Sequence, residues 1–175
     1  LRNSSAASDV YKRQIIILWS DHGWHFGEKR HLHKFTLWER STRIPFIVVA
    51  PGITETNTIC DQPVGMIDLF PTLNALCSLP LVLSLDGQNI EPLLRDPEQQ
   101  WNRPALTTHG QGNHAVRSRQ WRYIRYADGG EELYDHSRDP NEWTNLASRP
   151  EFIDVKNNHA QWLPKIDAVP LRKKK

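Results

Sequence analysis

The chain has 175 residues, with 22 Lys and Arg against 20 Asp and Glu, 38% hydrophobic residues and a mean hydropathy of −0.61. Its longest apolar run, residues 15–19, is far shorter than the roughly 20 residues that cross a bilayer, which excludes a transmembrane protein. The net charge of +2 arises at the chain ends, and residues 15–171 sum to −4. Because nucleic-acid-binding proteins carry their positive charge on a folded face, this distribution argues against a DNA or RNA partner.

Residues 1–14 show no helical or strand periodicity and no signal-peptide pattern, so we expect them to be foreign to the folded protein. A natural disordered arm is the alternative. The run that follows, Ile15 to Trp19, is apolar without alternation, which is typical of a strand buried on both faces of a parallel sheet. Such a strand needs neighbours that residues 1–14 cannot supply. We therefore expect the chain to be the back half of an α/β protein.

The rest of the chain divides at about residue 104. The first part, residues 15–103, predicts a helix over 36–42, a buried strand over 45–50, a helix after an N-cap at Asp68 and a short helix over 90–95. The second part, residues 104–165, predicts an antiparallel meander with a hairpin at 128–130 and a closing helix over 150–162. A basic tail, residues 166–175, follows. Cys60 and Cys77 lie in apolar surroundings and are expected to be buried thiols rather than a disulfide.

Four of the eight histidines lie between His22 and His33. Asp21 and His22 follow the carboxyl end of the first predicted strand, where open α/β sheets bind their ligands, and Gly23 leaves room for the chain to turn. A carboxylate and an imidazole at this point make half of a divalent-metal site, and Lys34 could meet an anion bound to the same metal. The alternative is that Asp21 caps a turn and the histidines are solvated.

Two longer stretches, residues 20–29 and 34–45, closely resemble the C-terminal half of the sulfatase catalytic domain, and best its iduronate-2-sulfatase-like bacterial branch. The resemblance covers about residues 15–146 and includes residues 49–52, 68–73, 85–87, 113–117, 121–124, 132–135 and 139–146.

This resemblance implies an α/β, alkaline-phosphatase-like sandwich, of which the chain holds the C-terminal part, followed by a small antiparallel β subdomain with a closing helix. It implies hydrolysis of a sulfate ester by a formylglycine nucleophile with a bound divalent cation, usually Ca²⁺. By matching positions, Asp21 and His22 are metal ligands and Lys34 is the catalytic cation that contacts the sulfate. Imidazole also suits zinc or manganese. The partner would be a sulfated carbohydrate or small sulfate ester, and the protein would be exported.

The formylglycine motif and the paired aspartates that complete the metal site are absent from the chain, so we expect it to be inactive alone. His114 could line the substrate cleft, although a solvated loop histidine is an equal alternative. The arginines of the meander are expected on a solvated sheet face: Arg117, Arg119, Arg122 and Arg125. Two rival functions stay open, a phosphoesterase of the same superfold and a non-catalytic carbohydrate-binding module built on the meander.

Overall fold

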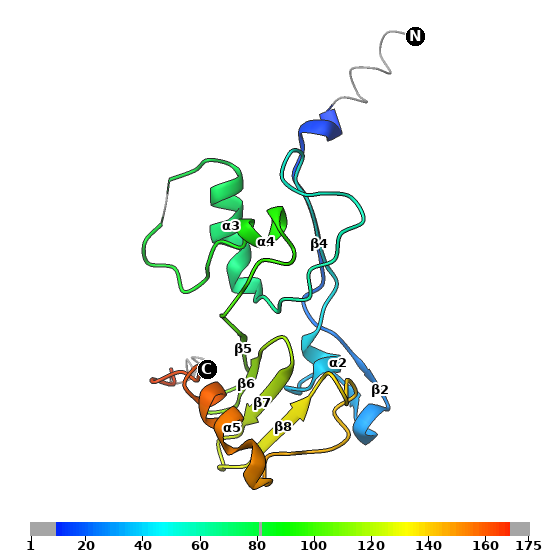
Figure 1. Cartoon of the computed structure of the whole chain (residues 1–175), viewed down its shortest axis with the longest axis vertical. Coiled ribbons are helices and arrows are strands. Elements are labelled where there is room, and N and C mark those ends of the chain that lie inside the picture. Colours follow the sequence, from blue (N-terminus) through cyan, green and yellow to red (C-terminus); the bar gives the residue numbers. More distant parts are fainter. Residues whose placement is uncertain (1–9, 81, 169–175) are drawn as a thin grey trace, which may run out of the picture. The chain divides into compact units, whose positions relative to one another are not determined.

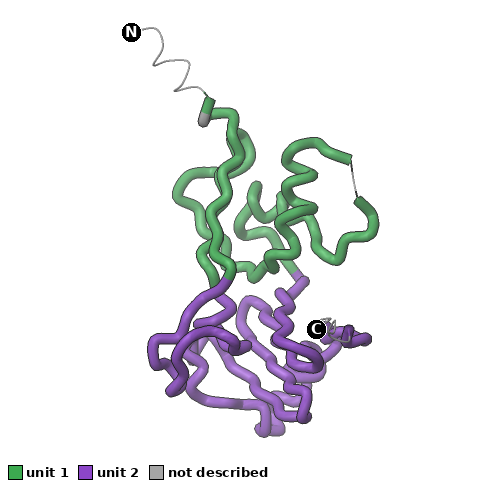
Figure 2. Tube along the Cα trace, turned by 180° about the vertical axis from the view of Figure 1, so that it is seen from behind, with its two compact units in different colours: residues 1–21, 44–101 green, residues 22–43, 102–175 purple. Residues whose placement is uncertain are grey.

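The computed structural model describes residues 10–80 and 82–168, which form two compact units (Figure 2). Unit 1 consists of Leu1–Asp21 and Ile44–Trp101, and unit 2 of His22–Arg43 and Asn102–Lys175. The segment 22–43 therefore groups with the C-terminal part of the chain. Most of the predicted foreign segment and of the predicted basic tail, residues 1–9 and 169–175, lies outside the described residues, and the domain boundaries stay predictions.

Unit 2 is built on the predicted four-stranded antiparallel meander. Its strands β5 (Ala105–Thr108), β6 (His114–Arg117), β7 (Trp121–Arg125) and β8 (Glu131–Asp135) lie side by side in chain order (Figure 1). A turn with Gly129 in the left-handed region, at φ 87°, joins β7 to β8. This conformation favours glycine, as the predicted hairpin requires.

Both faces of this sheet are covered. On one face Val116, Tyr123 and Leu133 form a buried cluster with side chains from η4 (Pro150–Phe152) and α5 (Ile153–Ala160), the predicted closing helix. On the other face Leu37 packs in a second cluster, with these strand residues: Ala115, Ile124 and Tyr134. Consecutive strand residues are therefore buried on opposite faces. The segment 22–43 thus covers the second face of the sheet and shields it from solvent.

The segment 22–43 is a small hairpin followed by one turn of helix. Strand β2 (His25–Phe26) pairs with β3 (Leu32–His33), η2 (Glu28–Arg30) closes the loop between them, and α2 (Glu39–Thr42) follows. The predicted helix over 36–42 is thus present but shorter. Its first turn begins only after Leu37 and Trp38 have entered the core.

In unit 1, strand β1 (Ile16–Trp19) pairs with β4 (Phe46–Val49), and the pairing is antiparallel. The expected parallel, doubly buried strand is therefore wrong for this chain. The hairpin and α2 reverse the chain between the two strands, so β4 returns in the opposite direction. Leu18 and Ile47 remain 57% and 53% exposed, because among the described residues only these two strands make up this sheet.

Asp68 lies at the predicted N-cap position of α3 (Leu69–Leu76), although its side chain makes no capping hydrogen bond to that helix. It precedes α3 in αR geometry, and its carboxylate accepts hydrogen bonds from the amides of Gly65 at 2.9 Å and Gln88 at 2.8 Å instead. Gly87 lies so close that an added Cβ would come within 2.0 Å of the Ile67 carbonyl oxygen. The loop that leads to α4 (Glu91–Arg95) is thus held against the start of α3.

Cys60 and Cys77 are free and exposed, so the expectation of buried thiols is wrong. Cys77 follows the last residue of α3, where the apolar stripe of the helix no longer turns it inward. In the described part of the chain no helix has the length and apolar character needed to cross a membrane.

The exposed apolar face of the β1–β4 ribbon is expected to cause self-association of this chain. Leu18 and Ile47 are register partners, so they lie on one face. Changing both to Thr is expected to lower light scattering while altering the unfolding free energy by only about 0.5 kcal/mol per site. The matched control changes their half-buried neighbours, Ile17 and Val48, to Thr. If the control reduces scattering equally without loss of stability, the exposed face is not the cause.

Candidate functional site

The hairpin brings Lys34 back to His22. Because β3 ends at His33, Lys34 leaves the hairpin next to the residues that entered it, and its Nζ lies 2.7 Å from Nε2 of His22. Both side chains are half-buried. Lys34 is flanked by two residues in the left-handed region, His33 at φ 77° and Phe35 at φ 72°. Such backbone strain at non-glycine residues is concentrated at functional sites.

The imidazole of His22 is oriented by the backbone. Its Nδ1 lies 2.7 Å from the carbonyl oxygen of Gly23, so Nδ1 carries the proton and donates it. The lone pair of Nε2 then faces Lys34, whose ammonium group donates to it. Metal-binding histidines are commonly oriented in this way, by a ring N–H that donates to a carbonyl oxygen and turns the other nitrogen toward the metal. Asp21 precedes His22 directly and is exposed, with Ser20 Oγ 3.5 Å from its Oδ1. An imidazole nitrogen and an exposed carboxylate fit two ligands of a divalent cation.

Gly23 is required by the close approach of α2. Its amide donates to the carbonyl oxygen of Ser41 at 2.8 Å, and an added Cβ would come within 2.1 Å of the carbonyl oxygen of Arg40. The sequence predicts a glycine here because the chain must turn. The structure adds a second reason, since the backbone of α2 lies too close to Gly23 for a side chain. Gly23 fixes the start of the hairpin against its end.

A buried ion-pair network, not predicted from the sequence, fastens the segment 22–43 to the sheet. Arg122 on β7 is 2% exposed, and its guanidinium contacts the carboxylates of both Glu39 and Glu142, with Nε 2.7 Å from Glu142 Oε1. Arg117 adds a contact of 3.3 Å to Glu39, and His136 one of 3.0 Å to Glu142. The expectation of a solvated arginine face is therefore wrong for Arg117 and Arg122.

Two hydrogen bonds that involve the backbone reinforce this network. The amide of Glu39 donates to Glu142 Oε2 at 2.9 Å, and Arg122 Nη1 donates to the carbonyl oxygen of Leu37 at 2.9 Å. Burial alone would raise the pKa of Glu39, but the guanidinium groups of Arg122 and Arg117 hold that pKa below its ordinary value. Glu39 is therefore ionised, as its place between two arginines requires.

Lys29, in the loop of the hairpin, forms a second anchor. Its Nζ lies 2.8 Å from the hydroxyl of Tyr134 and 2.5 Å from the carbonyl oxygen of Glu142, and it stacks over the rings of Trp38 and Tyr134 at 4.6 and 4.5 Å. Burial lowers the pKa of Lys29, and the carboxylates of Glu132 and Glu142 act in the opposite direction. The tip of the hairpin is thus held against Tyr134 and Glu142.

Among the described residues, one group of three side chains has ligand atoms close enough to hold an ion: Glu39, His136 and Glu142. The guanidinium of Arg122 contacts both of these carboxylates, which supplies the positive charge that a metal would otherwise bring. We therefore interpret this group as part of the anchor and not as a metal site.

The structure places His114 away from solvent. It is 2% exposed, and its ring nitrogens lie 2.9 Å from Thr108 Oγ1 and 2.8 Å from Asp167 Oδ1. The structure therefore does not bring His114 together with His22 and Lys34 in one cluster, and its role in substrate binding stays a prediction.

Comparison with known proteins defines the class. Residues 27–168 match the family described as "N-sulphoglucosamine sulphohydrolase, C-terminal", and the chain belongs to this family. It is 38% identical over 169 residues to a sulfatase of Formosa agariphila, covering 97% of the chain and 32% of that protein. It is 32% identical over 164 residues to arylsulfatase K of Gallus gallus, covering 83% and 30%.

Solved structures agree. A 2-O GAG sulfatase matches with a TM-score of 0.75 and 27% identity, over 84% of this chain and 34% of that one. A phosphonate monoester hydrolase of Agrobacterium radiobacter, 24% identical with a TM-score of 0.73, shares the fold. The predicted fold class, the C-terminal part of an alkaline-phosphatase-like sandwich, is confirmed, as is the sulfatase resemblance. The iduronate-2-sulfatase-like branch stays a prediction. The chain spans about a third of the length of these relatives.

We expect Arg122→Met to lower the free energy of unfolding by about 3–5 kcal/mol, because it removes the buried guanidinium that the carboxylates of Glu39 and Glu142 share. The matched control is Arg138→Met. The Arg138 side chain is 85% exposed, 3.8 Å from Asp135, so this change should cost at most about 0.5 kcal/mol. Urea unfolding followed by circular dichroism measures both. Equal, small losses in the two variants would contradict the anchoring role of Arg122.

Proposed function

We propose that this chain is the C-terminal part of a sulfuric ester hydrolase that removes sulfate from a sulfated carbohydrate or a similar ester. The observation that carries the proposal is the 2.7 Å contact of Lys34 with His22, in a chain that belongs to a sulfatase family. One structural relative is described as a GAG sulfatase, which supports a sulfated glycan as substrate. Neither rival function accounts for both the family and this contact. Export from the cell is part of the same proposal.

In this proposal Lys34 binds the sulfate. Its ammonium group would neutralise negative charge on the sulfuryl oxygens and on the leaving oxygen as the S–O bond breaks, which is a common electrostatic role in catalysis. The strained backbone at His33 and Phe35 and the hairpin below it hold Lys34 in place. Positioning by a rigid scaffold is what such a charge needs to act selectively on the transition state.

Asp21 and His22 are proposed as two ligands of a divalent cation, with Ca²⁺ favoured by the resemblance. When bound, the metal would supply further positive charge to the sulfate group. Nδ1 of His22 is held by the carbonyl oxygen of Gly23, so Nε2, the nitrogen that Lys34 contacts at 2.7 Å, is the one that would bind the metal. The remaining ligands and the formylglycine nucleophile are proposed to belong to the part of the parent enzyme that this chain does not contain. The chain by itself is then expected to hydrolyse no sulfate ester.

A hybrid enzyme tests the role of Lys34. The N-terminal part of the Formosa agariphila sulfatase, up to the residue aligned with Ile15, is joined to residues 15–175 of this chain. We expect Lys34→Met to lower kcat of the hybrid about 100- to 1,000-fold, because it removes a charge that stabilises the transition state. Hydrolysis of 4-nitrophenyl sulfate measures kcat, and EDTA should abolish it.

Lys165→Met is the control for this experiment, because Lys165 is an exposed lysine of the same unit. It should leave kcat unchanged. A Lys34→Met hybrid that turns over substrate like the unmodified hybrid would contradict the proposal, as would hydrolysis by the 175-residue chain alone.

A further inference from the structure

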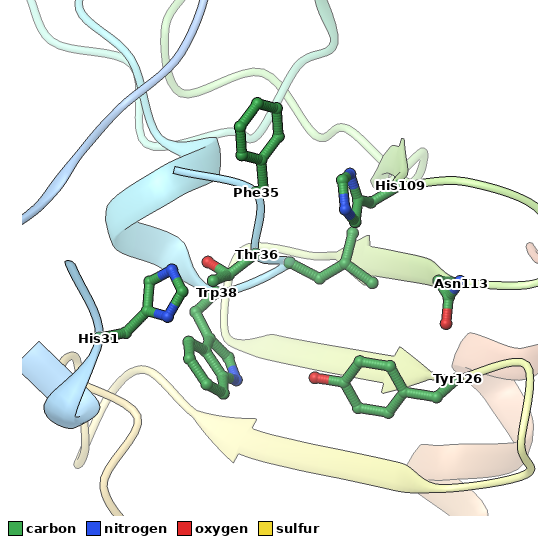
Figure 3. Close-up of a pocket in the computed structure, with 8 residues that line it drawn as sticks. His31, Phe35, Thr36, Trp38, His109, Asn113 and Tyr126 are labelled. Atoms are coloured by element: carbon green, nitrogen blue, oxygen red, sulfur yellow. The ribbon is translucent and has the colours of Figure 1, made fainter. Parts of the chain in front are cut away.

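A pocket of about 310 Å³ lies in unit 2 beside Lys34. Figure 3 shows Phe35 and His109 along one side of it and Trp38 and Tyr126 along the other. Its volume is at the lower end of the range for small-molecule sites, and a mostly apolar lining with a few polar groups is typical of such sites. Neither the family match nor the proposed roles of Asp21, His22 and Lys34 assign this pocket.

One wall of the pocket is rigid. Trp38 Nε1 donates to Glu132 Oε2 at 2.6 Å, and the hydroxyl of Tyr126 donates to Glu132 Oε1 at 3.2 Å. Burial and the carboxylate of Glu132 raise the pKa of Tyr126, so its hydroxyl stays a donor. These aromatic side chains are therefore fixed by hydrogen bonds that a ligand need not break.

The opposite wall offers an aromatic face. Phe35 is 68% exposed although large and apolar, and its left-handed backbone, at φ 72°, is rare for such a residue. Its ring lies 5.8 Å from that of His109 at an interplanar angle of 32°. His109 is exposed, and within the described residues its imidazole makes a ring contact but no hydrogen bond, so both of its nitrogens are available to a ligand. An aromatic face beside an unused imidazole suits a ring that carries polar substituents.

Lys34, which is proposed to bind the sulfate, lies next to this wall. Nζ of Lys34 lies 5.4 Å from the centre of the Phe35 ring. A ligand whose ring stacks on Phe35 therefore has an ammonium group within reach of a substituent at its edge. A sulfate ester is a substituent that this charge would bind.

We propose that the pocket binds the six-membered ring that bears the sulfate ester, and that Phe35 and His109 determine how tightly this ring is held. The inference rests on the proposed sulfate-binding role of Lys34. The ring could be a pyranose or a phenyl group, because each presents an apolar face whose C–H groups or π-system pack well on an aromatic ring. On the pyranose, hydroxyl groups would also meet His109.

The test measures dissociation constants of the 175-residue chain by NMR titration with three probes: inorganic sulfate, N-acetylglucosamine 6-sulfate and 4-nitrophenyl sulfate. At least one ring sulfate should bind about fivefold or more tightly than inorganic sulfate, since an aromatic pair contributes about 1 kcal/mol. Phe35→Ala should remove this advantage and leave the affinity for inorganic sulfate unchanged. The ring sulfate that loses more affinity in the Phe35→Ala variant shows whether the pocket binds a pyranose or a phenyl ring.

Phe26→Ala is the matched control, because Phe26 is another phenylalanine of unit 2, is 81% exposed and does not line the pocket. It should change no dissociation constant. His109→Ala should weaken the pyranose probe more than the phenyl probe, because only the pyranose offers hydroxyl groups to the imidazole.

Equal affinities for all three probes, or a Phe35→Ala variant that binds the ring sulfates as well as the unmodified chain, would overturn the inference. Lys34→Met separates it from the proposed function. If this change leaves the affinity for inorganic sulfate intact while the dependence on Phe35 persists, the role of Lys34 is wrong and the ring pocket stands. Absence of binding by all three probes to the folded chain counts against both.

Discussion

The guanidinium group of Arg122, buried between the carboxylates of Glu39 and Glu142, is the interaction on which unit 2 depends. Burying three charged groups costs desolvation energy, and a set of apolar side chains of similar volume could be as stable. What the network adds is specificity, because only one placement of α2 on the sheet gives each buried charge its partner. The segment 22–43 is thereby held in a single register against β7.

This anchor determines the geometry of the proposed site. With Glu39 fixed at one end and Lys29 at the tip, the short hairpin between them has little freedom, and Lys34 meets His22 at its base. The left-handed conformations at His33 and Phe35 are costly, by about 1–3 kcal/mol each, and persist only where surrounding contacts over-determine them. The buried ion pairs of Glu39 supply such contacts. They hold the C-terminal end of the segment and so help to maintain the strained conformations of His33 and Phe35.

The sequence predicted the order of the elements better than the interactions between them, and the roles of the site residues stay predictions. The meander and the closing helix were predicted correctly because alternation and turn residues are local signals. The direction of β1 relative to β4 was not, because an apolar run does not show how the chain returns. Arg122 was missed because both faces of β7 are covered, so alternation gives a polar residue there no distinct position. Its partner Glu142 lies in a loop at φ 60°, which no periodicity indicates.

Native-state hydrogen exchange of the 175-residue chain tests the anchoring of the segment 22–43 most directly. If the ion pairs join this segment to the sheet, the amides of Gly23 and Glu39 should open with the same free energy as those of Val116 and Tyr123, within about 1 kcal/mol. The amide of Gly23 donates to Ser41 and that of Glu39 to Glu142, so their protection from exchange reports on the hairpin base and on the anchor. Opening of the segment at a free energy several kcal/mol below that of the sheet would contradict the account.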